Sequence, residues 1–190
     1  MRKVMLLMHT SLDGFVAGPN GEMEWIAVDD EMWTYVTAIT DSADTVIFGR
    51  VTYQGMASYW PTAAEQPTAT QHDIHHARWV NPALKLVVSR TLEQAEWGPA
   101  RLVKDHIAEE IAQLKQQPGK NLLMIGSPGL AQTFMRAGLI DDYWLNVNPV
   151  ALGSGVPLFA NLAEPIPLKL AEAKAFRSGV VGLHYQADKK

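Results

Sequence analysis

A short segment in the first third of the chain combines a glycine, an arginine and a threonine where an apolar run ends. It reads Gly49-Arg50-Val51-Thr52, directly after Phe48. A glycine at a strand end lets the backbone approach a ligand, and an arginine can bind phosphate with a charged fork. The N–H groups that open a following helix also attract an anion. The pattern favours a phosphate-binding turn, with a solvated surface arginine as the alternative.

Two further turns offer related chemistry. Ser89-Arg90 follows an apolar run, and a hydroxyl beside an arginine suits the 2′-phosphate that marks NADP. The stretch 126–130, Gly-Ser-Pro-Gly-Leu, leads from another apolar run into a helical pattern, the usual place to seat a pyrophosphate. Neither signal is specific alone. Ser89-Arg90 also fits a plain turn, and the glycine turn lacks the full G-x-G-x-x-G pattern.

A glycine-rich loop leaves the first apolar run. Residues 11–21 contain three glycines and a proline, so this segment can fold closely over a ligand or serve as a simple connection. His72, His75 and His76 have helical spacing, but no carboxylate or cysteine motif completes a metal set. They are typical of a surface helix, and we expect no metal site.

Composition excludes several classes of protein. The chain has no cysteine, which rules out disulfides, thiolate catalysis and cysteine metal sites. The net charge of −4 offers no field that would gather nucleic acid or an anionic membrane. The apolar run after Met1 is too short for a signal peptide, and no stretch approaches a membrane span. We therefore expect a cytoplasmic protein.

Strands and helices must position these turns. Short apolar runs predict strands at 4–8, 45–48, 85–88, 122–125 and 143–147, and helical patterns lie between them. Residues 169–176 and 180–186 have only a turn between them, which predicts an antiparallel hairpin. The fold class is α/β: a mixed, mostly parallel sheet flanked by helices, with the hairpin added at one edge and residues 1–190 forming one domain.

Capping signals place the helix boundaries. Asp29 or Asp30 opens a helix that runs to about Thr40, and Asp105 is the expected N-cap of a later one. Ser127 is the expected N-cap of a third helix, which Gly138 ends. Residues 61–70 are predicted to form a surface loop.

Taken in order, these segments resemble the dihydrofolate reductase-like superfamily. They are most similar to the reductase domain of the bifunctional riboflavin-biosynthesis deaminase-reductase and its stand-alone bacterial relatives. The resemblance spans nearly the whole chain and lies in the order and spacing of the motifs. The motifs are residues 5–18, Gly49-Arg50-x-Thr52, Ser89-Arg90, Gly126-Ser127-x-Gly129-Leu130 and residues 138–149 with Gly153-x-Gly155.

The resemblance implies a single dihydrofolate reductase-like domain and a bound NADPH. Ser127 stands where the family commonly has the second glycine of a pair. The implied cofactor-binding residues are Ala17, Gly18, Gly49, Arg50, Thr52, Ser89, Arg90, Gly126, Ser127, Gly129 and Leu130.

The resemblance also implies a substrate side. Met23-x-Trp25 looks like the family's active-site loop, and Asp30 falls where the family has a catalytic carboxylate that binds substrate. Helix capping is the alternative role for Asp30. Asn146 lies near the position of a substrate-side hydroxyl in the family.

These expectations predict an NADPH-dependent reductase that transfers a hydride to a small pterin- or pyrimidine-like substrate. One alternative is 5-amino-6-(5-phosphoribosylamino)uracil reductase of riboflavin biosynthesis, although the basic helix residues expected to hold a ribosyl phosphate are missing. Another is a non-catalytic protein that binds or senses NADPH. The resemblance also suggests a homodimer.

Overall fold

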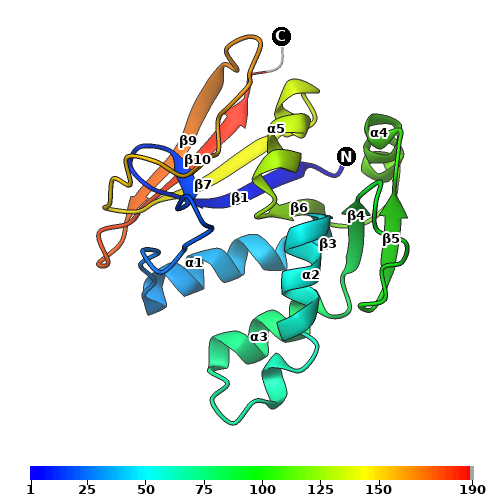
Figure 1. Ribbon diagram of the computed structural model, residues 1–190, viewed down its shortest axis with the longest axis horizontal. Helices are drawn as coiled ribbons and strands as arrows, with labels where there is room; N and C mark the ends of the chain where they lie inside the picture. The colour runs from blue at the N-terminus through cyan, green and yellow to red at the C-terminus, as the bar shows by residue number, and fades with distance from the viewer. Residues whose placement is uncertain (189–190) are drawn as a thin grey trace. The chain divides into compact units, whose positions relative to one another are not determined.

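The computed structural model describes residues 1–188 and has an α/β fold, a mostly parallel sheet flanked by helices with a small antiparallel sheet beside it (Figure 1). The predicted fold class is therefore confirmed. The contacts divide the chain into two compact units. Residues 1–2 and 35–127 form the first unit, and residues 3–34 with the chain from 128 onward form the second. That residues 1–190 act as one domain stays a prediction.

The strands of the first unit are all parallel. They are β3 (Ala43–Gly49), β4 (Leu84–Val88), β5 (Ala100–Val103) and β6 (Asn121–Ile125), in the order β5-β4-β3-β6. Three of them coincide with predicted strands. The sequence did not predict β5, because an exposed Arg101 interrupts a segment of only four residues. Since parallel strands share a direction, their carboxyl ends lie at one edge.

Helices α2 (Arg50–Tyr59), α3 (Gln71–Val80) and α4 (Ile107–Gln116) complete this unit. A buried cluster joins α2 and α3 to the strands, with Phe48, Tyr53, Val80 and Val87 among its members. The predicted loop at 61–70 contains one short 3-10 helix, η1 (Ala63–Glu65).

The N-cap prediction for α4 is wrong. The cap position is His106, whose φ of 56° is left-handed and whose side chain makes no capping bond. Asp105 instead pairs with Arg90. In contrast, Thr70 and Asp73 form a reciprocal capping box at the start of α3.

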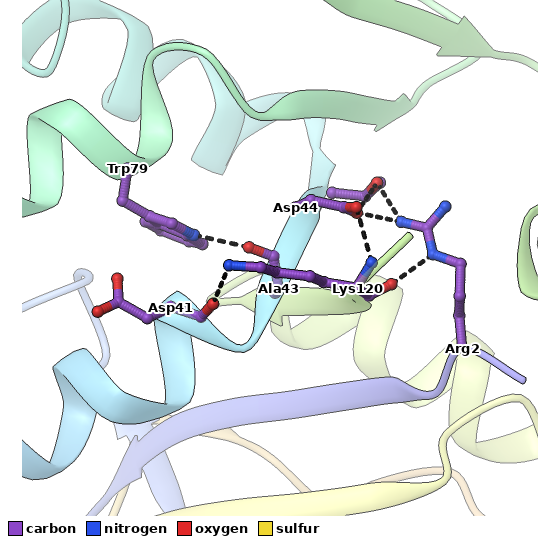
Figure 2. A network of polar contacts seen from close by, with 7 residues as sticks. Arg2, Asp41, Ala43, Asp44, Trp79 and Lys120 are labelled. Atoms are coloured by element: carbon purple, nitrogen blue, oxygen red, sulfur yellow. Dashed lines mark hydrogen bonds and ion pairs between the residues drawn. The ribbon is translucent and has the colours of Figure 1, made fainter. Parts of the chain in front are cut away.

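A buried arginine joins the amino-terminal ends of β3 and β6. Figure 2 shows the Arg2 guanidinium beside Asp44 and the carbonyl of Lys120, whose own N–H donates to Asp44 at 2.8 Å. Gly119 makes room for these contacts, because its φ is +145° and a Cβ there would lie 2.7 Å from Asp44 Oδ2. Removal of one member of such a buried group would leave an unpaired charge.

The second unit contains a mixed sheet. Strands β1 (Val4–Thr10), β7 (Asp142–Val147), β10 (Val181–Ala187) and β9 (Leu168–Ala175) follow in that order. β1 and β7 are parallel, and β10 is antiparallel to both of its neighbours. The predicted hairpin at the edge is thus confirmed. The short strands β2 (Phe15–Ala17) and β8 (Val156–Pro157) pair with each other, and β2 lies inside the predicted loop at 11–21.

Two helices begin in the second unit, α1 (Asp30–Asp41) and α5 (Pro128–Arg136). The chain after α5 turns at Gly138, whose φ is 62°, and the Leu139 N–H bonds the Phe134 carbonyl at 3.0 Å, as in a Schellman end. Ser127 directly precedes α5, where it was predicted as the N-cap, but its φ of 58° is left-handed and its hydroxyl accepts from the Gly49 N–H. Within residues 1–188, no helix is long and apolar enough to cross a membrane.

Lys85 on β4 is a charged residue placed in the core of the first unit. Its side chain is fully buried, its ammonium donates to the Asn81 carbonyl, and it lies 4.5 Å from the centre of a Trp97 ring. Because burial disfavours the charged form, the pKa of Lys85 is lowered to about 8.

This burial predicts a stability that rises with pH. Between the folded pKa of about 8 and the ordinary lysine pKa of 10.5, the unfolded lysine holds a proton that the folded one lacks. The free energy of unfolding should therefore increase from pH 8 to pH 9.5, measured as the urea midpoint. Lys85→Met should flatten this increase, and Lys104→Met, on an exposed residue, should not. An unchanged slope in Lys85→Met would contradict the assignment.

Candidate functional site

Three predicted turns meet at the carboxyl edge of the first unit. Gly49 is the register partner of Val88 on β4, and Ile47 is the partner of Met124 on β6. The turns that follow β4, β3 and β6 are therefore neighbours in that order. The predicted residues brought together here are Gly49, Arg50, Thr52, Ser89, Arg90, Gly126 and Ser127.

Two of these turns are interlocked. The Gly49 N–H donates to Ser127 Oγ at 2.9 Å, and the Ser127 N–H donates to Thr52 Oγ1 at 3.1 Å. Gly126 has a φ of +63°, and a Cβ there would lie 3.1 Å from the Thr52 methyl group. A glycine is thus needed at 126, and the hydroxyl at 127 fixes the turn after β3.

The first turn of α2 offers unpaired donors beside this interlock. No side chain caps the helix, so the N–H groups of Arg50, Val51 and Thr52 have no acceptor within it. The Arg50 side chain is exposed, and its nearest hydrogen-bond partner is Gln54 Oε1 at 3.4 Å. Together these groups can bind an anion such as a phosphate.

Ser89 and Arg90 follow β4 at the same edge. Ser89 Oγ accepts from the N–H groups of Thr91 at 3.2 Å and Leu92 at 3.0 Å and lies 3.4 Å from Thr91 Oγ1, so the hydroxyl builds the turn. Arg90 Nε lies 3.3 Å from Asp105 Oδ1, and both side chains are largely exposed. A surface pair of this kind holds the guanidinium only weakly.

A carboxylate organises the loop after β1 in the second unit. Asp13 accepts from the Ser11 hydroxyl at 2.6 Å and from the N–H groups of Leu152 and Gly153 at 3.1 and 2.7 Å. The Ser11 hydroxyl, followed by Gly153 and Leu152, lowers the pKa of Asp13 to about 2. The predicted site residues did not include Asp13, although it is the one acidic residue in a loop rich in glycine.

Three of the predicted residues share this loop. The Ala17 carbonyl would lie 2.2 Å from a Cβ on Gly155, so only glycine allows that approach. The Gly18 N–H donates to the Glu22 carbonyl at 2.8 Å, and Trp25 Nε1 donates to the same carbonyl at 3.0 Å. The loop is thus folded on itself around Glu22.

Asn148 joins three segments where β7 ends. Its Nδ2 donates to the carbonyls of Thr10 and Asn146 at 3.2 and 3.0 Å, and its Oδ1 accepts from the Ala27 N–H at 2.9 Å. The side chain is fully buried. Sequence reasoning missed it, although an asparagine between a strand end and Pro149 was a usable signal.

The two aspartates at the start of α1 differ in role. Asp29 accepts from the N–H groups of Met32 and Ser178, each at 2.8 Å, and chiefly the Met32 bond lowers its pKa. Asp29 is therefore the cap, and the capping alternative for Asp30 is wrong. Asp30 is an exposed carboxylate in the first helical turn.

The remaining predicted residues also lie in the second unit. Asn146 on β7 is 1% exposed, and its register partner on β1 is His9, whose pKa burial lowers to about 4. Gly129 and Leu130 occupy the first turn of α5, where a Cβ on Gly129 would meet no atom within 4 Å.

Histidines of α3 contact neighbouring side chains of the fold. His75 pairs with Asp41 at 3.1 Å, and the His76 ring packs against Trp60 and Trp79 with centroid distances of 4.1 and 5.0 Å. Burial lowers the pKa of His76 to about 3. No group of three or more metal-ligating side chains occurs in the part of the chain described, residues 1–188.

Comparison with known proteins places this arrangement in a family. The chain is 34% identical over 186 residues to the uncharacterized protein YyaP of Bacillus subtilis (strain 168), covering 97% of this chain and 94% of that one. It is 29% identical over 180 residues to the riboflavin biosynthesis protein RibD of Corynebacterium ammoniagenes, covering 90% of this chain and 49% of that one.

Solved structures support the fold. A Shewanella sp. PV-4 protein, provisionally named as a riboflavin biosynthesis protein, superposes with a TM-score of 0.77 at 23% identity, over 98% of this chain and 99% of that one. A deaminase and 5-amino-6-(5-phosphoribosylamino)uracil reductase of Thermotoga maritima gives 0.68 at 14% identity, over 98% and 56%. Residues 2–182 match the family model described as the RibD C-terminal domain. The chain belongs to the RibD C-terminal domain family, as its motifs had indicated.

Proposed function

We propose that the protein is a reductase that binds NADPH and transfers its hydride to a small organic substrate of pterin or pyrimidine type. The observation that carries this proposal is the set of three neighbouring turns at the carboxyl edge of the first unit. These turns combine unpaired helix N–H groups, the exposed Arg50 and the glycine at 126. The named function of the Thermotoga maritima relative supports the substrate class.

The residues present fit NADPH by their chemistry. The α2 N-terminus and Arg50 would hold a phosphate of the pyrophosphate bridge, while Ser89 and Arg90 would hold the 2′-phosphate. Gly126 would allow the backbone to come close. When bound, NADPH supplies the hydride, and the protein supplies position and electrostatic field.

Asp30 would act on the substrate side. An exposed carboxylate in a first helical turn can accept a hydrogen bond from a ring N–H or assist protonation. The loop held by Asp13 and Asn148 would exclude water from the reacting atoms. Ala17, Gly18 and Trp25 lie in that loop, and Gly129 and Leu130 open α5.

Two alternatives differ in substrate and turnover. A 5-amino-6-(5-phosphoribosylamino)uracil reductase would use the same cofactor residues, and the similarity to RibD favours it. A protein that senses NADPH without turnover would share the binding turns alone. NADPH oxidation against a panel of pterins, pyrimidines and carbonyls separates the three functions.

A homodimer remains part of the proposal. β9 is an end strand of its sheet, and Leu170 on β9 and Val181 on β10 are 51% and 36% exposed. Apolar side chains beside an unpaired strand edge favour association with another chain.

The cofactor assignment predicts a preference for NADPH and a loss of binding in an Arg50 variant. Arg50→Ala should weaken NADPH binding by roughly ten- to a hundredfold, because a charged hydrogen bond contributes about 1.5–3 kcal/mol. Calorimetric titration with NADPH and NADH measures both effects. Arg78→Ala, on an exposed residue of α3, is the matched control. Equal affinities for the two dinucleotides would remove Ser89 and Arg90 from the site, and unchanged NADPH binding in Arg50→Ala would remove Arg50.

Asp30→Asn tests the substrate carboxylate. The change keeps the size of the side chain and leaves the Asp29 cap intact, so the melting temperature and NADPH affinity should hold. Turnover should fall by roughly a hundredfold or more, because the charge that assists proton transfer is gone. Steady-state NADPH oxidation measures this, with Glu65→Gln as the control on an exposed acidic residue outside the proposed site. Turnover within a few-fold of the parent would exclude Asp30 from catalysis.

A further inference from the structure

One pair of polar side chains in the second unit has no partner in the contacts described so far. His9 on β1 and Asn146 on β7 are register partners, each one residue before its strand ends. Neither Nδ2 nor Oδ1 of Asn146 has a hydrogen-bond partner among residues 1–188, and the same holds for the buried Nδ1 of His9. Three unpartnered polar atoms therefore belong to two adjacent residues.

Such atoms are uncommon in native proteins, because a buried polar atom without a partner destabilises the fold. Asn148, two residues after Asn146, shows the usual state, with both ends of its amide bonded. The His9–Asn146 pair lies at the carboxyl ends of two parallel strands, where open α/β sheets bind ligands. The unpartnered atoms of the pair are therefore positioned where a ligand could bind them.

The neighbouring strand β10 places no side chain next to the pair. Register partners share a face of this sheet, as the stacked rings of Trp144 and His184 show at 3.7 Å. The partner of Asn146 on β10 is Gly182, which has no side chain. Beyond Gly182 lies Lys174 on β9, whose ammonium pairs with Glu31 at 3.2 Å. Glu31 belongs to the first turn of α1, and it neutralises Lys174, the cation in register with the pair on β9.

The pair itself contributes no charge. Because burial lowers the pKa of His9 to about 4, its ring is neutral in ordinary buffers, and its unpartnered Nδ1 acts as a donor or as an acceptor according to the tautomer. The Asn146 amide presents a donor and an acceptor. This set complements an uncharged group with an N–H and a carbonyl side by side. It offers nothing to offset the charge of a phosphate or a carboxylate.

We propose that His9 and Asn146 together recognise a lactam edge, the adjacent N–H and C=O of a heterocyclic substrate. The inference rests on the proposed function, because it names the part of the reductase substrate that this pair selects. A site with buried hydrogen-bonding groups rejects an analogue that cannot satisfy them. The pair would therefore discriminate between lactam rings and rings of the same shape without the carbonyl.

The first test measures stability without ligand. His9→Phe and Asn146→Leu keep the side-chain volume and remove the unpartnered atoms, so the melting temperature should stay equal or rise. Asn148→Leu breaks three hydrogen bonds and should lower it. Asn146→Ala provides a second variant in case leucine does not fit. A fall in Asn146→Leu and Asn146→Ala as large as that in Asn148→Leu would overturn the proposal, because the amide would then have partners without a ligand.

The second test measures binding directly on the NADP⁺-saturated protein. The probes are uracil and 4-hydroxypteridine as lactam rings, pyrimidine and pteridine as rings without a lactam, and inorganic phosphate. The ¹⁵N resonances of the His9 ring, assigned by their loss in His9→Phe, should shift with the lactam rings alone. His9→Phe and Asn146→Leu should weaken lactam binding at least tenfold while NADPH affinity holds. Equal lactam binding in the variants, or a response of His9 to phosphate alone, would overturn the proposal.

The two proposals fail in different ways. A lactam response of His9 without NADPH oxidation on any substrate would support the pair and contradict the reductase function. NADPH oxidation with a substrate that leaves the His9 resonances unmoved would support the reductase function and overturn the pair. The binding measurement therefore does not depend on turnover.

Discussion

The hydroxyl of Ser127 is the contact on which the candidate cofactor site depends. It accepts from the Gly49 N–H, while the Ser127 N–H donates to Thr52, so two turns from separate strands hold each other. Gly49 precedes α2, and the interlock therefore sets where the first N–H groups of that helix point. A second glycine at 127 would lack the hydroxyl. With serine the turn is less flexible than it would be with glycine. A fixed turn favours cofactor binding, because less of the backbone must be ordered when the cofactor binds.

Short polar side chains also fix loops by hydrogen bonds in the second unit. Asp29 and Asn148 each bind backbone groups from two or more segments, and Asp13 binds the Ser11 hydroxyl and the backbone of Leu152 and Gly153. The pKa values of Asp13 and Asp29 are lowered. The reach of these side chains is short, so they fix loop positions more tightly than long side chains could. A loop fixed in this way can carry ligand contacts without a helix or strand of its own.

Much of the fold could be predicted from the sequence, because the buried parallel strands are continuous apolar runs such as Val4–Met8. The turns at Gly49, Ser89 and Gly126 were also predictable, since their positions follow from strand ends. The sequence alone could not predict the contacts that one residue makes with backbone groups far along the chain. Three examples depend on neighbours far along the chain: the bond between Ser127 and Gly49, the bond between Asp29 and Ser178, and the unpartnered Nδ1 of His9.

The pairing of β1 with β7 has a consequence for how the chain is made on the ribosome. The Val4 N–H bonds Asp141 Oδ2, and these residues are 137 positions apart. At ~5–20 residues per second, β1 waits roughly 7 to 27 seconds before its partner exists. During that interval an apolar strand with unpaired edges stays exposed on the nascent chain. The β1–β7 pair can therefore form only after every strand of the first unit has been made.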